Sequence, residues 1–476
     1  MTDQPDRDDS TESVSASEDV ARGANDHTSV LRRIVRRLVR FYYPRIEISG
    51  SERIPGNGPV LLCANHANSL IDPVLIGWAS QRPVRFLAKA PLFKTPVLGP
   101  VMQSLGMIPA FRGSDDKRQV RRNMESLDVG SRALAEGGAM GIFPEGKSHD
   151  AMALEMVRSG ASRIAIQAAE QGAKGLVVVP IGINYQNKEQ FRSSVWILVG
   201  EPIPIDEWLD QHDGESRAAM RALTTELDVR LRQVVIHLDE LDWEPWVGEL
   251  ECMLKHNTVL NSNQRTPLQR RMRIADALNH FLTSDRGQVD AMAQKITSFR
   301  TTAEAVGLKA SDRVFSASGV GLIAGLALDV LGLVLFLGPA LLGTVFHLLP
   351  FVVTRAISRK IRTPGRTTVS MYRLAVGVPI YIAWYALSAG WLLSSQSPWA
   401  VLAACLLMPF AGMIALEYWR RAGGICRSVW AQVRVGFRRS RLQELRESHS
   451  DISGKLAELA DRYDQALESQ QTSGPE

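Results

Sequence analysis

The chain has 476 residues, of which 45% are hydrophobic and 22% are charged, and its net charge is +5. This length suits two or three domains, which excludes a small disulfide-stapled protein and a wholly disordered one. The charges are segregated: apart from Asp329, no formal charge occurs from Val314 to Thr354, and none lies between Arg373 and Glu417. Such stretches predict that the chain enters a bilayer.

The amino-terminal region has two parts. Residues 1–29 hold eight acidic residues and two arginines among small polar residues, so we expect a disordered acidic tail rather than a secretory signal. Residues 30–43 place apolar side chains at helical spacing and arginines on the other face, which predicts a basic amphipathic helix. This pattern is typical of a helix at a membrane interface, and a solvated surface helix of the first domain is the alternative.

Residues 44–208 alternate short apolar runs with amphipathic segments, which predicts an α/β domain whose mixed sheet is covered by helices. The clearest helix is expected from about Lys117 to Glu136, with Asp115 or Asp116 as its cap and Gly137 after its end. Strands are expected at 60–64, 84–88, 107–111, 139–143, 176–183 and 195–200. Residues 209–312 are polar and favour helix, so we expect a helical connector there.

Both uncharged stretches are about twice the ~20 residues that one crossing needs, so each is predicted to be a hairpin. In residues 374–416 the polar run Ser394–Pro398 separates two spans. In residues 314–353 the break is expected at Gly338-Pro339, and because Pro350 interrupts the short second half, a re-entrant segment is the alternative. Together the two stretches predict an α-helical membrane region.

Arginine-rich segments follow each uncharged stretch, and residues 418–476 read as a basic, then polar, helical tail. The positive-inside rule places these segments, and with them the α/β domain, on the cytoplasmic face of an integral membrane protein. Asp329 would be costly inside a span, but the sequence assigns it no role.

Two kinds of partner are not expected. The cysteines match no disulfide framework or zinc spacing, so neither a metal site nor a bound cofactor is predicted; they are Cys63, Cys252, Cys405 and Cys426. Nucleic-acid binding is disfavoured because the arginines flank apolar spans instead of forming a folded stripe with stacking aromatics.

A polar cluster, Asn65 to Pro73, follows the strand at 60–64. His66 is a candidate general base, because an imidazole titrates near neutral pH. Asp72 is a candidate to orient the ring, although on a regular helix the two side chains would be about 240° apart, so the chain must turn between them. A hydrogen-bonded loop histidine and an aspartate that caps a helix before proline are the structural alternatives.

Three further segments end or interrupt strands in the same region. Gly106 to Arg112 ends with a lone cation, and Phe143-Pro144-Glu145-Gly146-Lys147-Ser148 carries a carboxylate, a permissive glycine and a second cation. The third segment, around Pro180, is expected to close a strand with a rigid turn. Arg112 and Lys147 are candidates to bind a phosphate.

These four segments, in this order, resemble the four sequence blocks of the glycerolipid acyltransferase family, which includes glycerol-3-phosphate and lysophosphatidate acyltransferases. The resemblance covers about Gly58 to Pro204. It implies the fold of that family, with His66 as the base and Asp72 as its partner. Substrate-binding and supporting positions follow from the matching blocks. The former are Arg112, Glu145, Gly146, Lys147 and Ser148, and the latter are Asn65, Gly106, Phe143, Pro144 and Pro180.

This chain departs from the usual pattern in two places: five residues separate His66 from Asp72 instead of four, and Lys147-Ser148 stands where the family usually has Thr-Arg-Ser. Both variants are similar to the branch that acylates glycerol 3-phosphate or dihydroxyacetone phosphate and carries trailing membrane segments. The implied activity is acyl transfer in phospholipid biosynthesis, from acyl-CoA or acyl-acyl carrier protein to a glycerol phosphate acceptor at the lipid bilayer. The alternative is a lipid-binding protein that retains the fold without catalysis.

Overall fold

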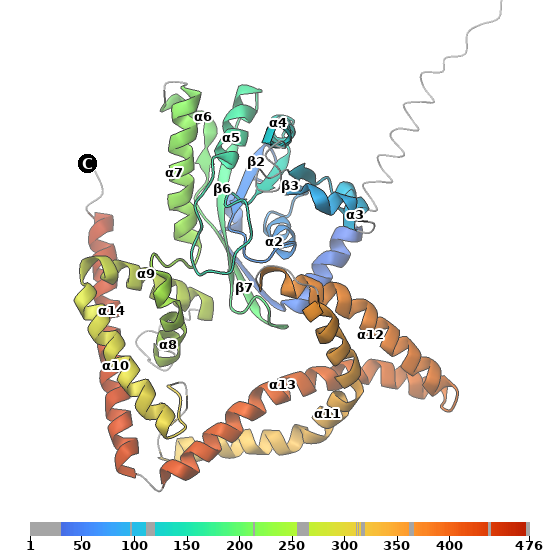
Figure 1. The fold of residues 1–476 in the computed structure, drawn as a ribbon, viewed down its shortest axis with the longest axis vertical. Coiled ribbons are helices and arrows are strands. Elements are labelled where there is room, and N and C mark those ends of the chain that lie inside the picture. The colour runs from blue at the N-terminus through green and yellow to red at the C-terminus, as the bar shows by residue number, and fades with distance from the viewer. Residues whose placement is uncertain are drawn as a thin grey trace, which may run out of the picture. The chain divides into compact units, whose positions relative to one another are not determined.

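The computed structural model describes residues 30–95, 98–110, 120–212, 215–254, 266–310, 312, 314–315, 319–360, 366–436 and 439–472. It divides into two compact units. The first contains the chain up to Val235 together with Pro364–Met371, and the second contains Ile236–Thr363 and Tyr372–Glu476 (Figure 1). The acidic tail, Arg112, Asp115 and Asp116 lie outside the described residues.

A mixed eight-stranded sheet forms the centre of the first unit, in the order β1-β7-β6-β2-β5-β3-β4, with β8 also paired to β6 (Figure 1). Its strands are β1 (Arg45–Ser49), β2 (Val60–Ala64), β3 (Val84–Lys89), β4 (Ile108–Ala110), β5 (Ala139–Ile142), β6 (Val177–Tyr185), β7 (Ser194–Val199) and β8 (Ile203–Pro204). The strands from β6 to β4 are parallel, whereas β7 and β8 run antiparallel to β6. The prediction of a mixed sheet covered by helices is confirmed.

Burial explains which strands the sequence revealed. All five residues of β2 are buried, as expected of a parallel strand covered on both faces, which reads as a continuous apolar run. The edge strand β1 is short and partly exposed, and β8 has two residues. Neither gives a strong periodic signal, and neither was predicted.

Pro180 lies inside β6, so the expectation that it closes a strand was wrong. The strand continues to Tyr185 because Pro180 falls at a gap in the pairing on one side: β8 reaches Val178, and β7 begins at Ile181. Proline has no N–H to give to the ladder, and such a gap is where a strand tolerates it. The carbonyl of Pro180 is used, since it accepts from the amide of Gly200 at 2.9 Å.

Helices cover this sheet. They are η1 (Ser51–Arg53), α2 (Ile71–Ala79), η2 (Ala90–Lys94), α3 (Leu98–Ser104), α4 (Val120–Ala135), α5 (Gly160–Glu170), α6 (Ile205–Asp210) and α7 (Ser216–Val234). Buried side chains of α4, α5 and α7 share one core with the sheet. Gly137 adopts φ 81° shortly after the end of α4, as expected of a glycine that ends a helix.

The amino-terminal helix runs from residue 30 to 42. Arg36 donates to the Gly77 carbonyl at 2.5 Å, and the guanidinium of Arg40 lies over the Trp78 ring. Val30 and Ile34 remain about half exposed. The helix therefore packs on the α/β domain through part of its surface, and some of its apolar side chains remain exposed to solvent.

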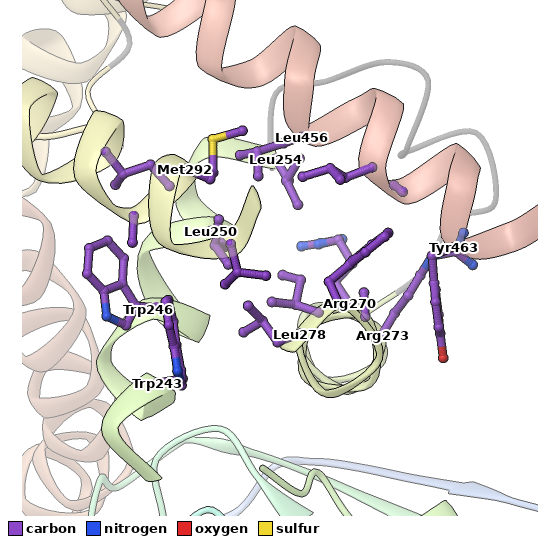
Figure 2. Close-up of a pocket in the computed structure, with 18 residues that line it drawn as sticks. Trp243, Trp246, Leu250, Leu254, Arg270, Arg273, Leu278, Met292, Leu456 and Tyr463 are labelled. Atoms are coloured by element: carbon purple, nitrogen blue, oxygen red, sulfur yellow. The ribbon is translucent and has the colours of Figure 1, made fainter. Parts of the chain in front are cut away.

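Four helices of the second unit, α8 (Glu244–Leu254), α9 (Pro267–Ser284), α10 (Arg286–Ala305) and α14 (Arg439–Thr472), pack together after the short turn η4 (Leu241–Trp243). Apolar side chains from these helices surround a cavity of about 110 Å³, with Trp243 and Trp246 on one wall and Leu456 and Tyr463 of α14 on another (Figure 2). The carboxyl-terminal tail thus completes a helical bundle, which its polar sequence did not reveal.

Among the described residues, three helices are long and apolar enough to cross a membrane. They belong to α11 (Gly319–Lys360), α12 (Val369–Leu393) and α13 (Pro398–Gly436), and the short turn η5 (Arg366–Thr368) precedes α12. The hairpin expected within 314–353 is absent, because α11 continues through Gly338-Pro339 and Pro350. No polar turn residues stand at Gly338 as they do at Ser394–Pro398, so in this apolar stretch the prolines stay inside a helix.

Helix α11 packs along two partners in turn. Its first half lies against the end of α13, where Val330 and Trp430 line one groove. Farther along, Thr344 accepts from the Trp419 indole at 2.7 Å, and His347 lies 2.9 Å from the Tyr385 hydroxyl of α12. The last turns approach the start of α12, since a Cβ on Gly377 would lie 3.3 Å from the Thr354 side chain. The two ends of α11 therefore lie beside the end of α13 and the start of α12.

Candidate active site

The predicted catalytic segments meet at one edge of the sheet. Asn65 and His66 follow β2, and Phe143 to Glu145 follow β5, while Tyr185 ends β6. Since β2 pairs in parallel with both β5 and β6, the carboxyl ends of all three strands lie together, where α/β proteins usually bind ligands.

His66 and Asp72 are in contact. Nδ1 of His66 lies 3.0 Å from Oδ2 of Asp72, which is completely buried. The chain turns between them at Ser69, whose φ of 38° is in the left-handed region, a strained conformation that is often retained at functional sites. Because the chain turns at Ser69, the two side chains meet, although a regular helix would place them about 240° apart.

Asp72 is not the cap of α2. The helix begins at Ile71 with Leu70 in the capping position, so Asp72 is its second residue. Its carboxylate instead accepts from the Asn68 amide at 2.7 Å and from the Tyr185 hydroxyl at 2.6 Å, in addition to His66. A buried carboxylate needs such partners, and three donors hold this one in a single orientation.

The His66 ring is held on its flat face as well. It stacks on Phe143, with the ring centres 4.0 Å apart and the planes 13° from parallel. The carbonyl of His66 accepts from the His149 amide at 3.1 Å. Because Nδ1 faces Asp72 and the side chain is 16% exposed, Nε2 is the nitrogen available to a substrate.

Glu145 and His149 form a second pair beneath this site. Oε2 of Glu145 and Nε2 of His149 are 2.7 Å apart, and Glu145 is completely buried. Burial raises the pKa of Glu145, and His149 partly offsets this effect. Burial opposes a charge on His149, but its hydrogen bond to Glu145 and the charge of that carboxylate outweigh burial and raise its pKa. The pair therefore holds a proton more firmly than its members would separately.

The remaining predicted substrate-binding residues lie on the turn after Glu145. Gly146 adopts φ 75°, a conformation that favours glycine. Lys147 is half exposed and pairs with Glu155 at 2.9 Å, whereas Ser148 donates to the Thr367 hydroxyl at 3.4 Å. Arg112, the predicted cation at the end of β4, lies outside the described residues.

Arg158 is a cation that the sequence did not single out. Its chain approaches Gly146 so closely that a Cβ there would lie 3.5 Å from Arg158 Cδ, and its amide donates to the Pro144 carbonyl at 3.0 Å. Its exposed side chain lies in no motif. Its position beside Gly146 alone makes Arg158 a candidate to bind a phosphate, the role expected of Arg112 and Lys147.

Each supporting residue has a structural place. Asn65 is buried and exchanges hydrogen bonds with the backbone of Ile183, at 2.7 and 3.2 Å. Gly106, at φ 71°, follows the end of α3.

Within the described residues, no three His, Cys, Asp or Glu side chains are arranged to hold a metal ion. The apolar cavity of Figure 2 is lined by other residues, all from the second unit.

Part of the chain is similar to known acyltransferases. Residues 45–184 match the acyltransferase family. Over 85 residues the chain is 40% identical to glycerol-3-phosphate O-acyltransferase 2 of Saccharomyces cerevisiae, covering 18% of this chain and 11% of that protein. It is 25% identical over 143 residues to a 1-acyl-sn-glycerol-3-phosphate acyltransferase of Borreliella burgdorferi, covering 30% of this chain and 52% of that protein.

A crystal structure of the 1-acyl-sn-glycerophosphate acyltransferase of Thermotoga maritima is also similar, at 18% identity and a TM-score of 0.33, over 44% of this chain and 80% of that one. The two sequence relatives are matched over only 11% and 52% of their own lengths. The family match covers the α/β region that holds His66 and Asp72. Residues 45–184 of this chain therefore match the acyltransferase family, and two of the proteins similar to this chain are glycerolipid acyltransferases.

Proposed function

We propose that this protein is a membrane-bound O-acyltransferase that moves a fatty acyl group from an acyl thioester to glycerol 3-phosphate or to its 1-acyl derivative. The contact between His66 and Asp72 supports this proposal most directly. It holds one nitrogen of the imidazole at 3.0 Å from a buried carboxylate and leaves Nε2 for an acceptor hydroxyl. The proposed acyl donor is acyl-CoA or acyl-acyl carrier protein.

In the proposed reaction, Nε2 of His66 takes the proton from the acceptor hydroxyl while that oxygen attacks the thioester carbonyl. The C–S bond then breaks, and the proton on the imidazole passes to the leaving thiolate. The carboxylate of Asp72 stabilises the intermediate imidazolium without itself being protonated. Because the thioester is already activated, the protein needs no covalent acyl intermediate.

The turn after β5 is the proposed place for the acceptor phosphate. Gly146 adopts φ 75°, and Lys147 and Arg158 supply positive charge next to it. Lysine contributes a point charge and arginine a planar pair of donors. Arg112 is proposed as a further phosphate ligand, and Glu145 supports the turn from beneath through His149.

We further infer that α11 enters and leaves the bilayer on one face. A helix of 42 residues is about 63 Å long, twice the thickness of the hydrocarbon core. Its first half follows the end of α13, and its last turns reach the start of α12. If α12 and α13 cross as a hairpin, both ends of α11 are opposite the turn at Ser394–Pro398, and the basic segments are cytoplasmic.

The activity is tested with membranes that contain the full chain, offered a labelled acyl thioester and, in parallel, glycerol 3-phosphate, dihydroxyacetone phosphate and lysophosphatidate. We expect one of these alcohols to become labelled, and His66→Ala to reduce the rate ~10²- to 10⁴-fold. His212→Ala is a matched control, because Nδ1 of His212 donates to the Trp208 carbonyl at 2.8 Å, just beyond the end of α6.

Absence of labelling on every acceptor, or equal rates in the wild type and His66→Ala, would overturn the proposal. In that case the alternative, a lipid-binding protein without catalysis, predicts that both proteins bind phospholipid vesicles equally. The two functions are therefore separated by turnover rather than by binding.

A further inference from the structure

The turn η5 and the first residues of α12 belong to the same unit as the α/β domain. Residues 364–371 group with the α/β domain, although the helices on either side are apolar and belong mainly to the other unit. Two hydroxyl side chains of this segment are buried, Thr367 at 3% and Ser370 at 1% exposure. A serine and a threonine buried this deeply need hydrogen-bond partners.

Ser370 finds its partner in the catalytic turn. Its hydroxyl donates to Oδ1 of Asn68 at 2.7 Å. The other end of the same amide, Nδ2, donates to the Tyr43 hydroxyl at 2.8 Å. Asn68 is completely buried, and because its acceptor and its donor are both engaged, the side chain has one orientation.

Asn68 also touches the catalytic pair through its backbone. Its amide donates to Oδ2 of Asp72 at 2.7 Å, the same oxygen that contacts His66. The next residue is Ser69, in the left-handed region at φ 38°. A strained turn persists only when its surroundings determine it, and the fixed Asn68 side chain provides this restraint one residue before the strain.

Thr367 contacts the turn after β5, which carries Glu145 to Ser148. Its hydroxyl accepts from Ser148 at 3.4 Å, on the turn that carries Glu145 and Gly146. The segment therefore contacts both loops between which an acceptor would bind. This one stretch joins two parts of the site, Asn68 and Ser148, that are about 80 residues apart in the sequence.

We propose that Ser370 is a positioning residue that acts through Asn68 to hold the turn between His66 and Asp72 in its catalytic shape. This inference rests on the proposed acyltransferase activity. Since Ser370 lies in the first turn of α12, the start of this apolar helix contributes directly to the geometry of the catalytic site.

The test uses the full chain in membranes. Ser370→Ala removes the donor, and we expect kcat to fall about tenfold while KM for the thioester changes less than twofold. Ser370→Thr keeps a hydroxyl and should restore most of the rate. Ser358→Ala is the matched control, because the Ser358 hydroxyl donates to Arg355 of its own helix.

A double-mutant cycle identifies the route. If Ser370 acts through Asn68, then Ser370→Ala should cause little further loss in an Asn68→Ala background. Additive losses, or a Ser370→Ala protein as active as the wild type, would overturn the inference while leaving the acyltransferase proposal intact. Absence of activity in the wild type would instead contradict the proposed function itself.

Discussion

The Tyr185 hydroxyl donates a 2.6 Å hydrogen bond to Oδ1 of Asp72, the oxygen that His66 does not contact. The two residues are 113 positions apart in the chain, and the end of β6 brings them together. Burial, followed by the charge of Asp72, raises the pKa of Tyr185 well above its usual value. Tyr185 is therefore a neutral, permanent donor to this carboxylate.

Tyr185→Phe should lower kcat about tenfold, because Asp72 loses one of three donors and orients the imidazole less firmly. KM for both substrates should change little. The rate assay described above measures both quantities, and Tyr42→Phe, which removes a donor to the Glu189 carbonyl, serves as the control. An unchanged kcat in Tyr185→Phe would mean that the other two donors fix Asp72 sufficiently.

Arg158→Gln should raise KM for the acceptor about three- to tenfold and leave KM for the thioester unchanged, because Arg158 lies beside the Gly146 turn. The effect should diminish at high salt, where exposed charges are screened. Initial rates at varied acceptor concentration test this, with Arg217→Gln on α7 as an exposed control. Equal acceptor KM values in the two variants would remove Arg158 from the phosphate site.

The pair of Glu145 and His149 should make stability depend on pH. Both pKa values are raised in the folded protein, so the folded state binds more protons and stability falls as pH rises. The contribution of His149 is complete below about pH 6.5, its unfolded value, and is lost above its raised folded pKa. Between pH 6 and 9, the melting temperature of Glu145→Gln should therefore fall by a few degrees less than that of the wild type.

Thermal unfolding in detergent at several pH values measures this difference. Glu201→Gln removes an exposed partner of Arg53 instead and should follow the wild type at every pH. A Glu145→Gln protein whose melting temperature falls as steeply as that of the wild type would contradict the assignment.

Asp276 should destabilise the helical bundle at alkaline pH. Burial raises its pKa from 3.8 to about 7, and the nearby charge of Arg273 offsets only part of this effect. Stability is therefore lost as pH rises from about 4 to 7, and the carboxylate is ionised at a cost above that range. Asp276→Asn should slow hydrogen exchange in peptides of α9 and α10 at pH 8, and the gain should vanish near pH 4. Asp290→Asn, at an exposed position of α10, should show no such gain.

The arrangement of α11 can be read from cysteine labelling in intact cells, in a variant whose native cysteines are replaced by alanine. A membrane-impermeant maleimide should label Gln396→Cys from outside. It should label Gly321→Cys and Ser358→Cys only after the cells are opened, because the proposed arrangement puts both ends of α11 on the cytoplasmic face. External labelling of Gly321→Cys alone would show that α11 crosses the bilayer once.

Much of the site could be predicted because its residues are close together in the sequence. His66 and Asp72 flank a single turn, and Glu145 to Ser148 form one loop at the end of a buried apolar strand. In contrast, the expectation that Pro180 closes a strand was wrong, because the gap between β8 and β7 that accommodates it inside β6 depends on strands elsewhere in the chain. The prolines of α11 were likewise read as a break, although in an apolar helix their neighbours keep them helical.

The sequence by itself determined the α/β class, the apolar segments and the order of the chemical groups, because apolar periodicity and strand-end motifs are local properties. Only the tertiary structure brought Tyr185, Asn68 and Ser370 together at the turn between His66 and Asp72 and made the carboxyl-terminal helix part of a bundle. The physical reason is that a hydrogen bond requires two groups within about 3 Å. Where those groups lie 113 or 302 residues apart, the folded chain alone brings them together.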